Sequence, residues 1–398
     1  MIIMRLAKSP VPTGTVVDDH QFRMAVRSWI GENLPEAWRH SSFGPSDEAH
    51  VQRRTHFGRL LGEAGWLSIC WARSVGGGEM DASRRIILLE ELVAAGAPEP
   101  MNANVLGIFA PTLIKFGTLD QCQRFLPGMV NHESIWCQGF SEPGAGSDLA
   151  GITTRATVAG DELVVTGQKV WTSYAHLAEY CYALVRTSSE SRRHSGLTLV
   201  IVPMGQDGVQ VRPLRNMVGT EEFCEVFFED VRVPVANVVG TLGDGWRLAM
   251  YALAQERSVG LAQRSLKLAA EFRRVAAMAA HGRTDGNPRV SDALFSQGVV
   301  DAYVRSKVVT ATVRRAIELD AAGADIGVLS SIAKVFWSES HQSQMDLAAE
   351  LLGPKFVTGD DTGADWYRAA MFTRAETIYG GTSQIQRNVI ARSLGLPK

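Results

Sequence analysis

The 398-residue sequence has few cysteines, and none of them has the spacing of a metal or redox motif. Its five cysteines are scattered, and no two form a CxxC pair, which argues against a disulfide framework and against a zinc site. The histidines show no metal-ligand spacing either, so we expect no metal. Because unpaired cysteines are often buried, we expect these thiols to lie in the core of a reduced protein.

Long apolar runs and an excess of either charge are also missing. No uninterrupted apolar stretch reaches about 18 residues, the length that a membrane-spanning helix needs. The 40 basic and 42 acidic residues give a net charge of -2, so nothing points to nucleic acid or to an anionic membrane as a partner. The segment Met1–Lys8 becomes charged too soon for a secretory signal. We therefore expect a cytoplasmic protein.

The first of three segments, residues 1–135, is predicted to be an all-helical domain. Apolar side chains recur at three- and four-residue spacing over Val51–Gly65 and Arg84–Ala95. Pro111 is expected to open a further short helix, and Asp120 begins another.

The middle segment, residues 136–243, changes to short apolar runs bounded by turn residues. Leu197–Val202 and Glu225–Phe228 are examples, and Gly160–Asp161 predicts a hairpin turn. Strands do not alternate with helices here, so a parallel sheet is not expected. The pattern indicates a small antiparallel β-barrel or sandwich.

The last segment, residues 244–398, returns to a helical period. Long amphipathic helices are predicted over Trp246–His281, Asp292–Ala321 and Ile326–Leu352, and a final helix begins at Thr382. These four helices would form a bundle. The predicted class is α+β, with an N-terminal α domain, a middle antiparallel β domain and a C-terminal four-helix bundle.

The loop Phe140–Asp148 (FSEPGAGSD) is the first candidate binding element. It lacks the third glycine and the parallel-sheet context of a dinucleotide fingerprint, so a Rossmann site is not expected. Its closely spaced backbone N–H groups and the hydroxyls of Ser141 and Ser147 can approach an anion or the edge of a flat ring. A plain surface turn between helix and sheet is the alternative.

The strand Gly167–Ser173 (GQKVWTS) is the second element. Trp171 and Ser173 are two residues apart, which places both on one face of a strand. The indole can cover an aromatic ring system while the hydroxyl donates a hydrogen bond to a ring nitrogen. The alternative is a core tryptophan beside a solvated serine.

The third element is Tyr379–Arg387 (YGGTSQIQR). A hydroxyl residue opens a helix, and Gln386 follows Ser383 by three residues, a spacing typical of a capping box. The unsatisfied N–H groups at such a helix start form a ready anion site. Alternatively, the motif only caps a helix.

Together, these three motifs make the chain resemble the acyl-CoA dehydrogenase family from about residue 20 to the C-terminus. The resemblance implies bound FAD, a saturated acyl-CoA substrate that becomes the trans-2-enoyl-CoA, and an electron-transfer flavoprotein as the electron acceptor. It also implies a homodimer or homotetramer, with a hetero-oligomer as the alternative. The implied cofactor contacts are Gln138, Ser141, Ser147, Trp171, Ser173, Arg283, Glu350, Gly353, Thr382 and Gln384.

The catalytic base is the main departure from the commonest pattern of this family. Many members carry a carboxylate at the position of Gly380, which has no side chain to act as a base. Other members supply a glutamate from the helix that opens the C-terminal domain, directly before an arginine, and Glu256–Arg257 matches that place. The resemblance then implies Glu256 as base, the Gly380 N–H as a donor to the thioester carbonyl, and Arg257 and Ser147 as substrate contacts. A glutamate paired with an arginine or with solvent is the alternative.

Three other functions stay open on the same fold. The acyl chain could be attached to a carrier protein instead of CoA, which these motifs do not distinguish. The chain could be one subunit of a hetero-oligomeric enzyme, although elements of a flavin site and a base are present. A flavin monooxygenase is disfavoured because it would need neither the intact SEPGAGSD loop nor Glu256.

Overall fold

The structure is a computed structural model that describes residues 18–39, 48–188, 193–256, 260–281, 293–358 and 361–396. The chain forms two compact units, each assembled from separate stretches. The first unit comprises Met1–Asp18, Pro45–Met80 and Pro98–Gln255, and the second Asp19–Gly44, Asp81–Ala97 and Glu256–Lys398. The domain boundaries expected after residues 135 and 243 stay predictions of the sequence.

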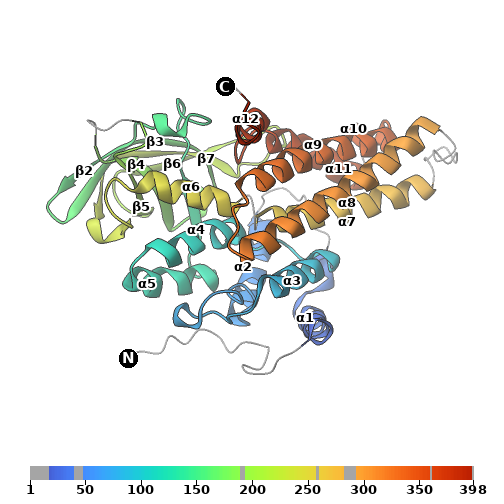
Figure 1. Cartoon of the computed structure of the whole chain (residues 1–398), viewed down its shortest axis with the longest axis horizontal. Helices are drawn as coiled ribbons and strands as arrows, with labels where there is room; N and C mark the ends of the chain where they lie inside the picture. Colours follow the sequence, from blue (N-terminus) through green and yellow to red (C-terminus); the bar gives the residue numbers. More distant parts are fainter. Residues whose placement is uncertain are drawn as a thin grey trace. The chain divides into compact units, whose positions relative to one another are not determined.

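One mostly antiparallel sheet dominates the first unit (Figure 1). Its strand order is β6-β7-β3-β2-β4-β5-β8, and β1 pairs in parallel with β4. The strands are β1 (Trp136–Gly139), β2 (Arg155–Ala159), β3 (Glu162–Ser173), β4 (Tyr180–Arg186), β5 (Leu197–Pro203), β6 (Val209–Leu214), β7 (Phe223–Pro234) and β8 (Val238–Val239).

The apolar pattern of each strand explains its place in this sheet. Strands β4 and β5 are buried along nearly their whole length, which explains why their sequences are almost continuous apolar runs. The predicted hairpin at Gly160–Asp161 is confirmed, because β2 and β3 pair antiparallel on either side of Gly160, which has a φ of 69°. The predicted α+β class is likewise confirmed.

The first unit also contains the helices α2 (Glu48–Glu63), α4 (Ala103–Phe116), α5 (Leu119–Val130) and α6 (Gly245–Gln255). Thr118 begins α5 with a capping box to Gln121. The prediction that Pro111 opens a helix is wrong, since Pro111 lies inside α4. An interior proline costs about 3 kcal/mol, and the burial of most side chains of α4 offsets that cost.

The second unit is helical. Its helices are α1 (Asp19–Asn33), α3 (Ala82–Ala94), α7 (Leu261–His281), α8 (Ala293–Ala321), α9 (Gly327–Leu352), α10 (Lys355–Thr358), α11 (Asp361–Glu376) and α12 (Ser383–Ser393). The long helices α7, α8 and α9 run side by side (Figure 1). Helix α9 packs against α7, α8, α11 and α12. The sequence pattern predicted α7, α8, α9 and α12 but missed α11.

The helix predicted over Trp246–His281 is not a single α-helix. Glu256 and Gly260, between α6 and α7, are in π-helical conformation. Single π-helical turns inserted into α-helices are rare and are frequent at functional sites. The position of the predicted base therefore coincides with a local change of helix geometry.

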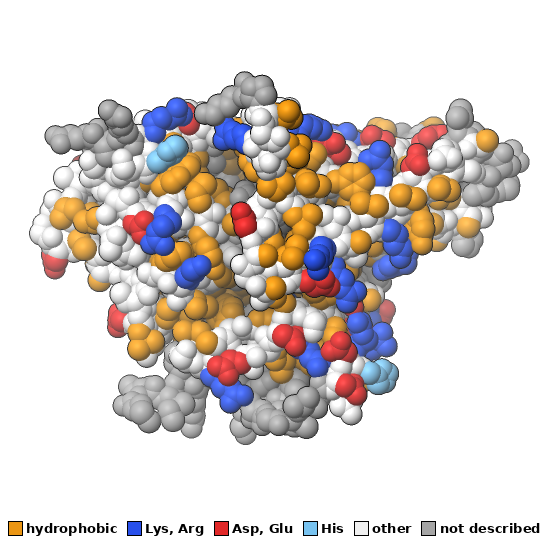
Figure 2. Space-filling view, in the orientation of Figure 1, with side chains coloured by type: hydrophobic (Ala, Val, Ile, Leu, Met, Phe, Trp, Pro, Cys, Tyr) orange, Lys and Arg blue, Asp and Glu red, His pale blue; other side chains and the backbone are white. Residues whose placement is uncertain are grey.

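Three further features of the described residues concern membrane insertion, metal binding and surface charge. Every described helix is too short or too polar to span a lipid bilayer. No group of three or more His, Cys, Asp or Glu side chains in the described residues could hold a metal ion. On the face drawn in Figure 2, basic and acidic side chains are interspersed with apolar ones.

Candidate active site

In the first unit, a buried ion pair joins the SEPGAGSD loop to strand β3. The Nζ of Lys169 donates to Oε1 of Glu142 at 2.8 Å, and both side chains are buried, that of Lys169 completely. The same ammonium donates to the carbonyl oxygens of Phe140 at 3.1 Å and Leu184 at 2.6 Å. All three N–H bonds of the ammonium are thereby used.

The charge on Glu142 is well stabilised. Its Oε2 accepts from the N–H of Thr153 at 2.6 Å, and its Oε1 from the N–H of Thr154 at 2.9 Å. Burial alone would raise the pKa of Glu142, but the Lys169 ammonium and these donors outweigh burial and lower this pKa to about 2. The pair therefore fixes the loop to the strand as an ionised unit at neutral pH.

The loop itself is a tight turn with an open outer side. Glu142 and Ala145 exchange backbone hydrogen bonds of 3.1 and 3.0 Å across it. A side chain at Gly144 or Gly146 would meet no atom within 4 Å. Ser147 is exposed and Ser141 is half-buried, and neither hydroxyl bonds to another described residue. The loop can thus receive a ligand without rearranging its own contacts.

Trp171 lies at a β-bulge that the sequence did not predict. Lys169 pairs with Val226 and Thr172 with Cys224, so three steps along β3 face two steps along β7. Trp171 has a φ of 59°, in the left-handed region that bulky residues rarely adopt. Strained conformations of this kind cost about 1–3 kcal/mol and cluster at ligand sites.

The bulge leaves the indole on the surface. The side chain of Trp171 is 63% exposed, and its ring lies edge-on to Phe223 with centroids 6.2 Å apart. Thr172 is fully buried, whereas Ser173 is partly exposed. The next residue, Tyr174, is also left-handed, with a φ of 56°. A large exposed aromatic face, with a hydroxyl two residues further on, fits a flat ring system with polar edges.

Gln138 lies on β1, the strand that directly precedes the SEPGAGSD loop. It is paired in register with Tyr182 of β4, whose hydroxyl donates to Oε1 of Gln138 at 2.7 Å. The N–H of Val170 donates to the carbonyl of Ser141 at 3.0 Å, which brings the loop against β3. In this unit, the Glu142–Lys169 pair and the Val170–Ser141 hydrogen bond therefore hold the loop against the strand that carries Trp171, and Gln138 is bonded within the sheet.

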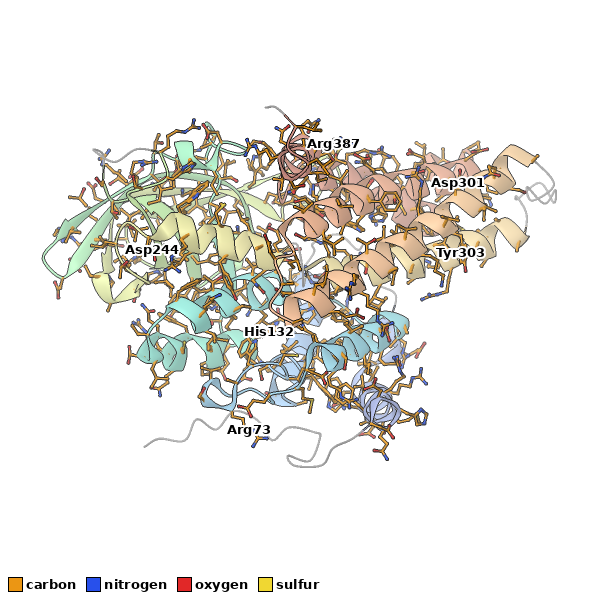
Figure 3. All side chains as sticks on the ribbon, in the orientation of Figure 1. Arg73, His132, Asp244, Asp301, Tyr303 and Arg387 are labelled. Atoms are coloured by element: carbon orange, nitrogen blue, oxygen red, sulfur yellow. The ribbon has the colours of Figure 1, made fainter. Side chains whose placement is uncertain are left out.

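His132 is a structural residue of the same unit (Figure 3). Its ring is buried, with Nδ1 3.1 Å from the carbonyl of Val130 and Nε2 accepting from the N–H of Asn102 at 3.3 Å. Burial lowers the pKa of His132 to about 4. This histidine is therefore neutral at physiological pH.

In the second unit, the carboxylate of Glu256 lies against Gly380. A Cβ built on Gly380 would lie 3.0 Å from Oε1 of Glu256 and 3.6 Å from its Cδ. Gly380 has a φ of 62° and Gly381 a φ of 88°, which favour glycine at both positions. Glu256, which is in π-helical conformation, and the Gly380–Gly381 turn therefore lie next to each other.

Thr382 begins α12, and this corrects the cap predicted from the sequence. The Oγ1 of Thr382 accepts from the N–H of Ile385 at 3.2 Å, so Thr382 rather than Ser383 is the N-cap. Gln386 does not complete a capping box; its Nε2 donates to the carbonyl of Gly380 at 3.0 Å. Gln384 is exposed in the first turn of α12.

Lys334 is a second buried lysine to which the sequence analysis gave no role. It lies on α9 and is 1% exposed, and its Nζ donates to the carbonyls of Glu376 and Gly381, both at 2.8 Å. The sequence gives one indication of this burial, since Lys334 is the single charge within the apolar helical stretch Ile332–Phe336. A lysine is seldom fully buried without partners, so such a position suggests buried acceptors.

The remaining predicted contacts lie elsewhere or outside the described residues. Glu350 is exposed in the last turn of α9, and Gly353 caps this helix through its N–H to Ala349. At 1.5 Å per residue, about 24 Å of helix separates Glu350 from Lys334. Arg257 and Arg283 fall outside the described residues, so their roles stay predictions.

Comparison with known proteins identifies the family. Profiles of the N-terminal, middle and C-terminal domains of acyl-CoA dehydrogenases match residues 17–133, 137–231 and 243–395. The chain is 39% identical to acyl-CoA dehydrogenase IpdE1 of Mycobacterium tuberculosis, over 96% of this chain and 98% of that protein.

Two solved structures resemble the whole chain. The Tcur3481–Tcur3483 steroid ACAD superposes with a TM-score of 0.83 at 28% identity, covering 95% of this chain and 97% of that one. The ChsE4–ChsE5 complex from Mycobacterium tuberculosis gives a TM-score of 0.81 at 29% identity, with the same coverage.

Proposed function

The chain belongs to the acyl-CoA dehydrogenase family, whose members are FAD-dependent flavoproteins, and on this premise we propose that it oxidises a saturated acyl-CoA to the trans-2-enoyl-CoA with Glu256 as the base. The observation that carries the assignment of Glu256 is its contact with Gly380. The carboxylate fills the space that a side chain at position 380 would need.

Glu256 accepts the α-proton of the thioester in this proposal. Removing that proton leaves negative charge on the thioester carbonyl, and the N–H of Gly380 would stabilise this charge as a hydrogen-bond donor. Bound FAD supplies the acceptor for the hydride that leaves the β-carbon. A general base of this kind contributes about a hundredfold to ten-thousandfold to the rate.

The residues that would hold FAD fall into two sets. In the first unit, Trp171 offers an exposed aromatic face, and Ser141 and Ser173 offer hydroxyls beside it. In the second unit, Thr382 and Gln384 lie at the start of α12, whose N–H groups favour an anionic group such as a pyrophosphate. These contacts fit the polar and aromatic parts of the cofactor.

A ring-bearing acyl group is the substrate class that we favour. The support is the steroid ACAD among the similar solved structures. An acyl chain on a carrier protein is the alternative. We further propose an electron-transfer flavoprotein as the electron acceptor.

A second candidate is that the chain works as one subunit of a hetero-oligomer, and one similar solved structure supports it. The ChsE4–ChsE5 structure is a complex of two named proteins. A homodimer or homotetramer is the alternative assembly. The FAD content of the chain expressed alone distinguishes self-sufficiency from dependence on a partner.

The test is an anaerobic titration of the purified protein with straight, branched and ring-bearing acyl-CoAs, followed by the visible flavin absorbance. Bleaching by ring-bearing thioesters supports the proposal. In Glu256→Gln the protein should keep FAD while the rate of bleaching falls about a hundredfold or more. Glu318→Gln, at a half-exposed glutamate on α8, is the matched control and should bleach normally.

Full bleaching by Glu256→Gln would refute Glu256 as the base. A yellow wild-type protein that no acyl-CoA bleaches would instead point to carrier-protein substrates or to oxygen chemistry. A colourless protein would favour the partner-dependent subunit.

A further inference from the structure

The ammonium of Lys334 connects both ends of the turn that carries Gly380. Its two acceptors are the carbonyl of Glu376, at the end of α11, and the carbonyl of Gly381, just before α12. Within the same turn, the N–H of Ser383 donates to the carbonyl of Thr377 at 2.9 Å. Lys334 therefore closes a loop whose two consecutive glycines would otherwise be free to change conformation.

Glu376 is itself held by a buried triad of charges. Its Oε2 lies 2.8 Å from Nδ1 of His341, and Nε2 of His341 lies 2.8 Å from Oε2 of Glu271. Burial opposes a charged imidazole, but the two carboxylates outweigh it and raise the pKa of His341 to about 10. The end of α11, and with it the carbonyl that Lys334 uses, is thus fixed by ionic contacts to α7 and α9.

Several charged groups face Lys334 from the surrounding helices. Burial lowers the pKa of Lys334 to about 8, while Glu256, Glu376 and Glu339 favour its charged form and Arg264 opposes it. Arg264 is turned toward the rings of Trp337 and Tyr379, 5.3 Å from each centroid. The carboxylate that favours the ammonium most is that of Glu256, the proposed base.

We propose that Lys334 is a positioning residue for the base: its ammonium fixes the Gly380–Gly381 turn against the side chain of Glu256. This role rests on the proposed function of Glu256. The geometry assigns to Lys334 one task, which is to hold the turn through the carbonyls of Glu376 and Gly381. This task requires no contact with substrate.

The experiment compares Lys334→Gln with the wild-type holoenzyme. A glutamine amide can still donate to one carbonyl, so the fold is disturbed less than by an apolar residue, but the positive charge is gone. Loss of one of the two carbonyl contacts should let the Gly380–Gly381 turn move relative to Glu256. The single-turnover rate of flavin bleaching should therefore fall about tenfold, whereas the acyl-CoA concentration that gives half of the maximal rate should change less than about twofold.

Lys334→Arg is the conservative variant, and Lys355→Gln, at an exposed lysine on α10, is the surface control. The arginine should restore most of the bleaching rate, and the surface control should bleach at the wild-type rate. A folded, FAD-containing Lys334→Gln with the wild-type bleaching rate would overturn the positioning role. If Glu256→Gln is inactive in parallel, that outcome leaves the proposed function intact.

A thermal double-mutant cycle provides a readout that does not depend on activity. Lys334→Gln should lower the melting temperature more in the wild-type background than in Glu256→Gln, because the turn that Lys334 holds lies against the Glu256 carboxylate. Equal decreases in the two backgrounds would show that Lys334 and Glu256 are not coupled and would overturn the proposal. This cycle remains informative when Lys334→Gln binds FAD poorly.

Discussion

The carboxylate of Glu256 occupies the space into which a side chain at position 380 would project. A Cβ on Gly380 would be 3.0 Å from Oε1 of Glu256, which is closer than an ordinary van der Waals contact. A carboxylate at position 256 and a side chain at position 380 therefore compete for one site. In the proposed function, Gly380 leaves room for the carboxylate of Glu256 and is not a lost catalytic residue.

Gly380→Ala should lower the rate of single-turnover flavin bleaching at least tenfold. The added methyl group would displace the Glu256 carboxylate, and a φ of 62° is strained for alanine. Stopped-flow absorbance with an active acyl-CoA measures this rate. Gly323→Ala is the matched control, because Gly323 has a φ of 77° but open space around it. Equal rates in the two variants would contradict the competition between positions 256 and 380.

Lys169→Met should lower the free energy of unfolding by about 3–5 kcal/mol, because it leaves the buried Glu142 without its cation. Urea denaturation of the cofactor-free protein measures this loss. Arg232→Met, which removes the exposed Arg232–Glu162 pair of the same sheet, should cost no more than about 1 kcal/mol. Similar losses in both variants would show that burial of the Lys169 pair has no special weight.

The stabilisation by His341 should depend on pH in a defined direction. The pKa of this histidine rises from its ordinary 6.5 to about 10 in the folded protein, so its contribution is complete below pH 6.5 and is lost as the pH rises through about 10. The difference in unfolding free energy between wild type and His341→Gln should thus be larger at about pH 6 than at about pH 10. Urea denaturation at both pH values provides the measurement. A difference that does not change with pH would contradict the charged triad.

Trp171→Ala should weaken FAD binding without destabilising the cofactor-free fold. The indole is 63% exposed, so its removal should change the unfolding free energy by no more than about 0.5 kcal/mol. Loss of an aromatic contact should increase the FAD dissociation constant about threefold to tenfold. Fluorescence titration with FAD gives this constant. Leu119→Ala, at a residue that is 61% exposed, controls for surface truncation, and equal affinities in the two variants would exclude Trp171 from the cofactor site.

The sequence was sufficient for the element types but not for the local distortions at the candidate site. Hydrophobic periodicity located α8 and α9 within a few residues, and Gly160 marked its hairpin, but α6 and α7 were predicted as one helix. The bulge at Trp171 and the π-helical turn at Glu256 depend on register against neighbouring strands and helices, which no local pattern encodes. Both distortions coincide with predicted site residues, where local rules are expected to fail.

The acceptors of the two buried lysines could not be predicted from the sequence either. Lys169 and Lys334 each lie in an apolar context that suggests burial, but their acceptors lie far away along the chain, at Glu142, Glu376 and Gly381.

The helix α11 was missed because its pattern is weakly amphipathic, and tertiary contacts with α9 stabilise it.

The Glu142–Lys169 pair constrains how this protein can diverge. A buried charge without its partner is far more costly than the pair or than two apolar residues of similar volume. Substitution at either position alone therefore passes through a poorly stable intermediate, whereas simultaneous replacement need not. Among related chains, residues at these two positions should change together or not at all, so the loop and the strand that they join are inherited as one unit.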